Sequence, residues 1–196
     1  PKVLVSRYGR IYVRVDEIVS LAKVAEKRGF DRTSHTEEER RALVKSLGYR
    51  IVEGINRVTA LTPMGLLCTS LLSHDRRGLT ASELRERMSF LLRIARDEGA
   101  ELALSLGPAD EALDPATDGP VREAIALLQQ DKSLQVHVAG GETVFQVPDD
   151  ERVTLDFQKN TALHWWVPSG LLAASLLTTP DRSRAAVHAR TRTLSR

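Results

Sequence analysis

The sequence predicts a mainly helical fold with a small antiparallel β meander, an α+β arrangement whose helices and hairpin are winged-helix-like. Three observations lead to this fold class. Helix-start patterns at Thr36, Thr62 and Thr80 precede stretches with apolar residues at helical spacing. From residue 136 the apolar residues alternate strictly, which is typical of strands. A separate alternating run at residues 10–15 stands apart from both patterns.

The run at residues 10–15 predicts one half-buried strand, because Ile11, Val13 and Val15 fall on a single face. No second strand pattern occurs within the next hundred residues. A lone strand leaves its backbone hydrogen-bonding groups unpaired. We therefore expect an orphan strand whose partners lie outside this chain, in a missing N-terminal domain.

Four helices are expected in the middle of the chain. Thr36 to Glu39 forms a capping-box signature, and the apolar residues that follow are spaced by 3, 4, 4 and 3 positions up to Val58. Thr62-Pro63 predicts a second helix over residues 64–72, and a capping box at Thr80 predicts a third, longer one. A loop rich in Pro, Asp and Gly then leads to a shorter helix that begins near Pro120.

The pattern after residue 135 predicts three strands. Two alternating runs flank Gly140-Gly141, and such a glycine pair favours a two-residue hairpin turn. A third alternating run, at Val153, Leu155 and Phe157, completes the expected meander. Pro168 is then expected to open a final apolar helix.

Composition bounds the class of protein. Of 196 residues, 42% are hydrophobic and 28% are charged, which is typical of a globular chain with the cytoplasm as its default compartment. The longest nearly apolar stretch, residues 165–177, is too short for a transmembrane helix and contains a proline. Residues 180–196 carry five arginines and one acid, Asp181, and predict a basic, disordered tail that could touch phosphates.

Sequence motifs for catalysis or metal binding are lacking. There is no G-x-S-x-G, Walker or G-x-G-x-x-G motif, and the five histidines are scattered. His35 lies near Glu38 and Glu39, but these acids belong to a capping segment that faces solvent. The single cysteine, Cys68, falls within an apolar helix and predicts an inert core thiol. We expect no metal, no cofactor and no catalytic residue in this chain.

The winged-helix-like order raises the alternative of a stand-alone DNA-binding or scaffold module. The helix before the hairpin would then read the major groove. Its residues 121–132 carry two cations, Arg122 and Lys132, beside Glu123 and Asp131. A net charge of zero gives little attraction for phosphates, so nucleic acid is not the expected partner.

The segment from Lys159 to Trp166 groups polar and aromatic side chains just before the last helix. Trp165 and Trp166 fit two interpretations: a pair of core indoles, or anchors at a membrane–water interface. The polar residues Lys159, Asn160 and His164 are the remaining candidates for a site.

This segment resembles a family signature. Residues 155–164, Leu-Asp-Phe-Gln-Lys-Asn-Thr-Ala-Leu-His, followed by Val167-Pro168, are similar to the Tyr-Tyr-(Lys/Arg)-Asn-Asn-x-x-x-His…Pro signature of bacterial and mitochondrial glycerol-3-phosphate acyltransferases. In that family the signature lies C-terminal to the catalytic domain. Residues 9–21 and 55–72 resemble other stretches of the family, and the resemblance covers about residues 9–177 in the same order. Phe157, Gln158 and Thr161 depart from the signature.

The resemblance implies a domain organisation. Residues 1–33 would be the C-terminal edge of the acyltransferase domain, with residues 10–15 as the last strand of its α/β sheet. Residues 34–179 would form the C-terminal helical domain with its β-hairpin, and residues 180–196 the basic tail. The family's catalytic His-x-x-x-x-Asp and Glu-Gly-Thr-Arg-Ser motifs do not occur here. We therefore expect a C-terminal fragment that is inactive alone.

The resemblance also implies an activity and partners. The parent enzyme would transfer an acyl chain from acyl-CoA or acyl-ACP (acyl carrier protein) to the sn-1 hydroxyl of glycerol-3-phosphate, in phospholipid biosynthesis. Its place would be the cytoplasmic face of the cell membrane, as a peripheral protein, and its nearest partner the missing acyltransferase domain. Lys159, Asn160 and His164 would touch substrate or hold the domain junction, while Trp165 and Trp166 would contact the membrane interface. A degenerate scaffold that binds a separate catalytic subunit is a further alternative.

Overall fold

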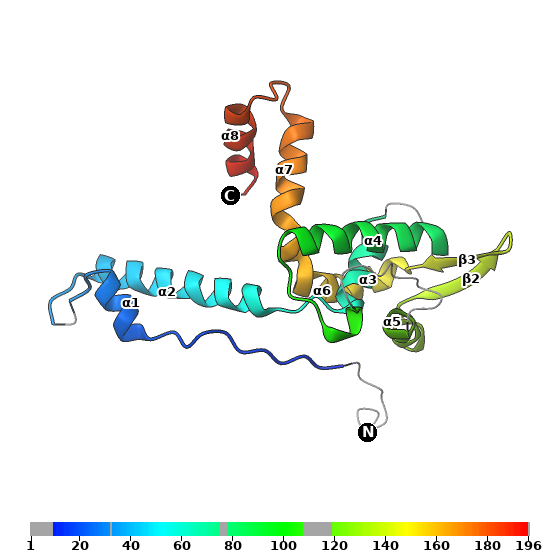
Figure 1. The fold of residues 1–196 in the computed structure, drawn as a ribbon, viewed down its shortest axis with the longest axis horizontal. Coiled ribbons are helices and arrows are strands. Elements are labelled where there is room, and N and C mark those ends of the chain that lie inside the picture. The colour runs from blue at the N-terminus through cyan, green and yellow to red at the C-terminus, as the bar shows by residue number, and fades with distance from the viewer. Residues whose placement is uncertain (1–9, 32, 75–77, 108–118, 196) are drawn as a thin grey trace. The chain divides into compact units, whose positions relative to one another are not determined.

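The computed structural model of the chain describes residues 10–31, 33–74, 78–107 and 119–195, and Figure 1 shows its elements. The chain divides into two compact units, a smaller one of Tyr12–Thr59 and a larger one of Pro1–Ile11 with Ala60–Arg196. Its elements in chain order are α1 (Leu21–Lys27), α2 (Glu37–Val58), α3 (Pro63–Leu72), β1 (Leu79–Thr80), α4 (Ala81–Asp97), η2 (Leu104–Leu106), α5 (Gly119–Gln130), β2 (Gln135–Ala139), β3 (Glu142–Gln146), η3 (Asp149–Glu151), α6 (Arg152–Ala162), η4 (Leu163–Trp165), α7 (Val167–Thr178) and α8 (Arg184–Leu194).

The smaller unit is a pair of helices. The predicted capping box is present at the start of α2, where Thr36 and Glu39 each bind the other's backbone N–H. The short helix α1 was not predicted; it begins after Ser20, whose hydroxyl accepts a hydrogen bond from the backbone of Lys23. The two helices share a small core made of Val24, Ala25 and Leu43, with Val19, Phe30 and Leu47 packed against it.

The apolar face that the sequence predicts for α2 is only partly buried. Leu47 packs against the small core, but Val44, Ile51 and Ile55 are exposed. Residues 10–20, which include the predicted strand, form neither helix nor strand. Its expected partners lie outside this chain, so the pairing stays a prediction.

The larger unit is built around α3. Thr62 caps this helix as predicted, with its hydroxyl accepting from the backbone of Gly65 at 3.1 Å. Almost every residue of α3 is buried, because α4, α5 and α6 all pack against it. A Cβ atom added at Gly65 would stand 3.4 Å from the Cβ of Ala162. Two small residues therefore let α3 and α6 approach closely.

The sheet of the larger unit has three antiparallel strands in the order β1-β3-β2. β2 and β3 form the predicted hairpin, and both turn glycines, Gly140 and Gly141, have positive φ angles of 60° and 82°. β1 pairs with the other edge of β3, with Leu79 opposite Phe145. The order helix, strand, helix, helix, hairpin confirms the winged-helix-like arrangement and the α+β fold class.

The predicted third strand of the meander was wrong. Val153, Leu155 and Phe157 lie in helix α6, where Leu155 and Ala162 are buried while Val153 and Phe157 are exposed. Leu155 and Ala162 are seven positions apart, which is two helical turns and places them on one face. The third strand is instead β1, whose two residues are too short to show an alternating pattern.

The prediction of a disordered tail was also wrong for residues 184–194, which form α8. Ser183 caps this helix by accepting a hydrogen bond from the backbone of Ala186 at 3.3 Å. Val187 is buried, and the hydroxyls of Thr191 and Ser175 lie 2.9 Å apart, so α8 packs along α7 (Figure 1). A cap and one buried apolar residue are enough to dock a helix whose other side chains are mostly polar.

Candidate functional site

The polar candidates of the sequence lie at the end of α6 and in η4. Lys159 is half-buried, and its ammonium group is held by Asp156 on the preceding turn at 2.6 Å. Asn160 is exposed on the same helix. His164 lies in η4 with its ring 4.7 Å from that of Trp165. The ammonium group of Lys159 is therefore already engaged, while the amide of Asn160 faces solvent.

The two tryptophans of this segment belong to the core, which corrects the interface interpretation for Trp166. Trp166 is 7% exposed, and its indole N–H donates to the backbone carbonyl of Leu91 in α4 at 2.8 Å. Trp165 is half-buried and packs against the same core. An indole whose ring and N–H are both used inside the protein cannot also anchor in lipid headgroups.

A second contact joins the segment to α4. The hydroxyl of Ser169, in the first turn of α7, donates a hydrogen bond to the carboxylate of Glu98, just after the end of α4. Together with the bond from Trp166 to Leu91, it fixes the start of α7 against α4. Neither pairing could be predicted from local sequence patterns, because the partners lie more than 70 residues apart.

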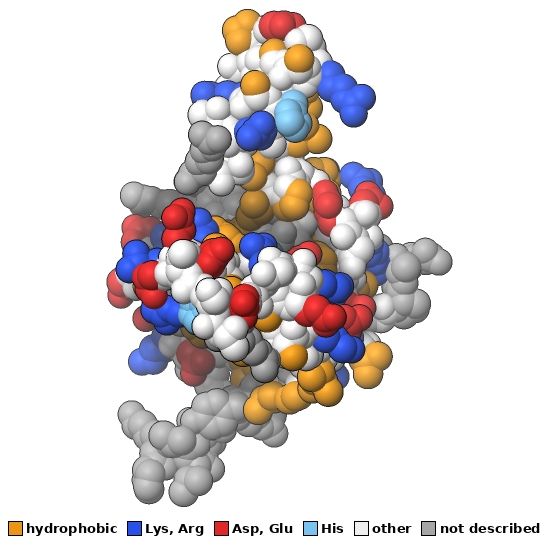
Figure 2. All heavy atoms as spheres, turned by 90° about the vertical axis from the view of Figure 1, so that its left-hand side faces the viewer, with side chains coloured by type: hydrophobic (Ala, Val, Ile, Leu, Met, Phe, Trp, Pro, Cys, Tyr) orange, Lys and Arg blue, Asp and Glu red, His pale blue; other side chains and the backbone are white. Residues whose placement is uncertain are grey.

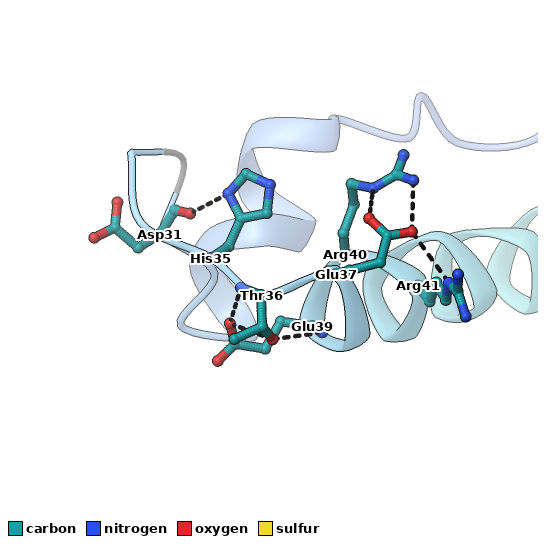
Figure 3. Close-up of polar contacts among 7 residues, drawn as sticks. All are labelled: Asp31, His35, Thr36, Glu37, Glu39, Arg40 and Arg41. Atoms are coloured by element: carbon teal, nitrogen blue, oxygen red, sulfur yellow. Dashed lines mark hydrogen bonds and ion pairs between the residues drawn. The ribbon is translucent and has the colours of Figure 1, made fainter.

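His35 lies just before the start of α2, among residues that cap this helix or form ion pairs on its first turn (Figure 3). Its Nδ1 lies 3.2 Å from the backbone carbonyl of Asp31, and its ring packs against Phe30. Arg40 and Arg41 both donate to the carboxylate of Glu37, and the bond from Arg40 is the main reason that the pKa of Glu37 lies below its ordinary value. The carboxylate of Glu39 is engaged in the cap of α2, and that of Glu37 in ion pairs. Over the described residues no group of three or more His, Cys, Asp and Glu side chains could hold a metal ion.

Cys68 is an inert thiol, as the sequence predicts. It is fully buried in α3, where its sulfur lies 3.8 Å from that of Met64. Burial raises the pKa of the thiol to about 12, so the reactive thiolate is scarcely populated at neutral pH.

The smaller unit contains an ion pair that the sequence did not reveal. Both carboxylate oxygens of Asp16 accept from one Nη atom of Arg57 in α2, at 2.8 and 2.9 Å. The pair lines a surface hollow of about 360 Å³ together with Tyr49, Arg50 and Glu53. The two partners are 41 positions apart, so no local pattern could have joined them. The pair tethers the extended segment before α1 to α2.

Helix α5 lacks the charge of a DNA-reading helix. It carries Arg122 and Glu123, and the carboxylate of Glu123 lies 3.5 Å from the guanidinium of Arg10. The opposite face, with Val121, Ala124 and Leu128, is buried in the core. One cation on a helix of twelve residues offers little attraction to phosphates, and the DNA-binding alternative is not favoured.

Comparison with known protein families agrees with the signature at the end of α6. The family described as the glycerol-3-phosphate acyltransferase C-terminal region matches residues 1–196, the whole chain. The chain belongs to this family. Relatives named "Putative acyltransferase plsB1" from Mycobacterium bovis and from two strains of Mycobacterium tuberculosis are 25% identical over 171 residues.

The match covers 87% of this chain but only 25% of those relatives, so the chain spans about a quarter of their length. The names of this family and of these relatives are those of acyltransferases, a class of transferases. A helix long and apolar enough to cross a bilayer is not found in the described part of the chain.

Proposed function

We propose that this chain works as the C-terminal region of an enzyme that acylates the sn-1 hydroxyl of glycerol-3-phosphate. The acyl donor is acyl-CoA or acyl-ACP, and the product enters phospholipid biosynthesis at the cytoplasmic face of the membrane, where the enzyme is a peripheral protein. The observation that carries the proposal is the family match over all 196 residues. The chemistry itself belongs to an acyltransferase domain, because the general-base motif His-x-x-x-x-Asp does not occur in this sequence.

The smaller unit provides one proposed contact with that domain, and the end of α6 in the larger unit provides another. Val13 and Val15 alternate with polar residues at the start of this unit, and each is more than 80% exposed. Ile11, which precedes them in the chain and belongs to the larger unit, is exposed to the same degree. Val44, Ile51 and Ile55 form a second exposed apolar surface on α2. Exposed apolar side chains in this number are typical of a surface that another domain covers. By the family resemblance, residues 10–15 would join the sheet of the acyltransferase domain as its last strand.

Lys159, Asn160 and His164 are proposed to hold the junction with the acyltransferase domain rather than to react. Asp156 already neutralises the charge of Lys159, and His164 packs on Trp165. The side chain of Asn160 is exposed at the surface of α6. Of the three residues, it is therefore the best placed to contact another domain.

The first test is the reading frame upstream of the codon for Pro1. An in-frame Asn-His-x-x-x-x-Asp followed by Glu-Gly-Thr-Arg-Ser supports the proposal. A stop codon and a start site next to Pro1 contradict a covalently linked acyltransferase domain and favour a scaffold for a separate subunit.

The second test is acyl transfer. We expect purified 196-residue chain to leave labelled glycerol-3-phosphate unacylated in the presence of acyl-CoA or acyl-ACP, and the same chain joined to its acyltransferase domain to form lysophosphatidic acid. In the joined protein, Asn160→Ala should lower kcat/KM, whereas Val153→Ala, an exposed change on the same helix, should not. Acyl transfer by the isolated chain would overturn the division of labour proposed here.

A further inference from the structure

Helix α7 carries an apolar stripe that the rest of the chain leaves open. Leu172 is 49% exposed, Leu176 41% and Leu177 84%, and Ala173 is exposed beside them. Because residues three and four positions apart lie on one side of a helix, these four side chains form a continuous strip along the helix. A contiguous exposed apolar strip on a helix marks a surface that contacts something else.

The hydroxyl groups of α7 are bonded to neighbouring segments. Ser169 donates to Glu98, and Ser175 meets Thr191 of α8 at 2.9 Å. The hydroxyl of Thr178 accepts from the Nε of Arg190 at 3.4 Å. Every hydroxyl of α7 is therefore engaged by a neighbouring segment.

Helix α8, which packs on α7, is basic: it carries Arg184, Arg190 and Arg192 and no acid. Asp181 lies just before it. The backbone N–H and hydroxyl of Ser183 donate to Asp181 and lower its pKa. Arg184 and Arg192 are exposed at positions i and i+8 of α8, on one side of the helix. Figure 2 shows blue cationic side chains at the top of the molecule, on the α8 side of this helix pair.

Apolar side chains beside arginines match the chemistry of one occupant in particular, an anionic lipid surface. Leucines of a helix that lies in the interface enter the boundary between headgroups and acyl chains, and arginines bind the headgroup phosphates. A helix of 12 residues is about 18 Å long, well short of the roughly 30 Å hydrocarbon core. It can lie on a bilayer but cannot cross it.

We propose that the α7–α8 pair, through Leu172, Leu176 and Leu177 and the arginines of α8, docks the protein on anionic phospholipid. The inference rests on the proposed function, because it gives the proposed peripheral membrane association a defined surface. It also moves that association away from the tryptophans, of which Trp166 is sealed in the core.

Sedimentation with lipid vesicles tests the proposal on the full chain. The probes are vesicles of phosphatidylcholine alone and vesicles of phosphatidylcholine mixed with phosphatidylglycerol. We expect the chain to sediment with the mixed vesicles, to stay in solution with phosphatidylcholine alone, and to be released as the salt concentration rises. Circular dichroism shows whether each variant below is folded.

Two sets of variants separate the apolar and the charged contributions. Leu172→Gln with Leu176→Gln keeps a good helix former at both positions and should weaken binding by about tenfold or more per leucine. Arg184→Gln with Arg192→Gln should weaken it by about fivefold per arginine. The matched controls, Val138→Gln with Leu104→Gln and Arg122→Gln, change exposed residues of the larger unit outside this surface and should bind as the parent does.

The proposal is overturned if the parent chain does not bind anionic vesicles, or if the control variants lose as much binding as the α7–α8 variants. Self-association through the leucines would also overturn it, and would appear as a dimer in analytical ultracentrifugation that Leu172→Gln abolishes. Vesicle binding is measured without substrate, so its result is independent of the acyl-transfer test. An enzyme that acylates glycerol-3-phosphate but does not bind vesicles through α7 and α8 would contradict only the docking surface.

Discussion

The indole N–H of Trp166 donates a hydrogen bond of 2.8 Å to the backbone carbonyl of Leu91, 75 positions earlier in the chain. Trp166 is the residue immediately before α7, and Leu91 lies in the second half of α4. The bond therefore fixes the point at which α7 leaves the core. Together with the hydrogen bond from Ser169 to Glu98, this bond positions the start of α7, and with it the exposed leucines of that helix.

Trp166→Phe should lower the free energy of unfolding of the larger unit by about 1–3 kcal/mol. The phenyl ring keeps most of the apolar burial but leaves the carbonyl of Leu91 without its side-chain donor and a small space in the core. Urea unfolding followed by circular dichroism measures the loss. Trp165→Phe serves as the control, since Trp165 is only half-buried; an equal loss in both variants would show that the buried N–H of Trp166 has no special role.

Cys68 should react with iodoacetamide only when the larger unit unfolds. Burial raises the pKa of this thiol to about 12, and the side chain is fully enclosed in α3. We expect negligible labelling of the folded chain at pH 8 and complete labelling in urea, which intact-mass spectrometry detects. Rapid labelling of the folded chain would contradict the burial of α3 at the centre of this unit.

Local sequence signals were sufficient for much of the fold. The capping boxes at Thr36 and Thr80, the Thr62-Pro63 start and the Gly140-Gly141 turn all act through neighbouring backbone groups, and the structure contains each of them. The family signature likewise lies in one continuous segment. Such features could be read from the sequence because their partners are within a few residues.

The sequence-based predictions were wrong where contacts between distant segments determine the secondary structure. The alternation at residues 153–157 indicated a strand, but burial of Leu155 against the core selects a helix. The basic tail forms α8 because Val187 and Thr191 meet α7. The pair of Asp16 and Arg57 has no local signature at all. The leucine stripe of α7 was visible only as apolar sequence, since its exposure depends on what packs beside it.

The two glycines inside α2 should respond differently to alanine. No atom of the described residues comes within 4 Å of a methyl group at Gly48, so Gly48→Ala should stabilise the helix by about 1 kcal/mol through better helix propensity. A methyl group at Gly54 would overlap the carboxylate of Asp16. Gly54→Ala should lose this gain and displace Asp16 from Arg57.

Amide hydrogen exchange of α2 measures both substitutions, with Gly48→Ala as the matched control for Gly54→Ala. We expect slower exchange in the first variant and faster exchange in the second. Equal slowing in both would show that the segment before α1 does not rest on Gly54 in solution.

The ion pair between Asp16 and Arg57 should make the stability of the smaller unit depend on pH in the acid range. The hydrogen bond from Arg57 is the largest cause that lowers the pKa of Asp16 below its ordinary value of 3.8, and a bond from the backbone of Glu17 adds to it. A carboxyl whose pKa is lower in the folded state contributes its full stabilisation above the unfolded pKa. That contribution is lost as the pH falls below about 4 and through the folded pKa, where the carboxylate takes up a proton.

Asp16→Asn isolates this contribution, because asparagine keeps the size of the side chain and removes the charge. The other acids of this unit with lowered pKa values, among them Asp31, Glu37 and Glu39, are present in both proteins and cancel in the difference. Protection factors of the α2 amides should be lower in Asp16→Asn by a constant ratio between pH 5 and pH 8, and should converge with the parent values below about pH 4. High salt should reduce the difference in protection factors between the two proteins, since the ion pair is partly exposed to solvent. If the difference in protection factors persisted unchanged at pH 3, Asp16 would act through the fit of its side chain in the surface hollow beside Gly54, and not through its charge interaction with Arg57.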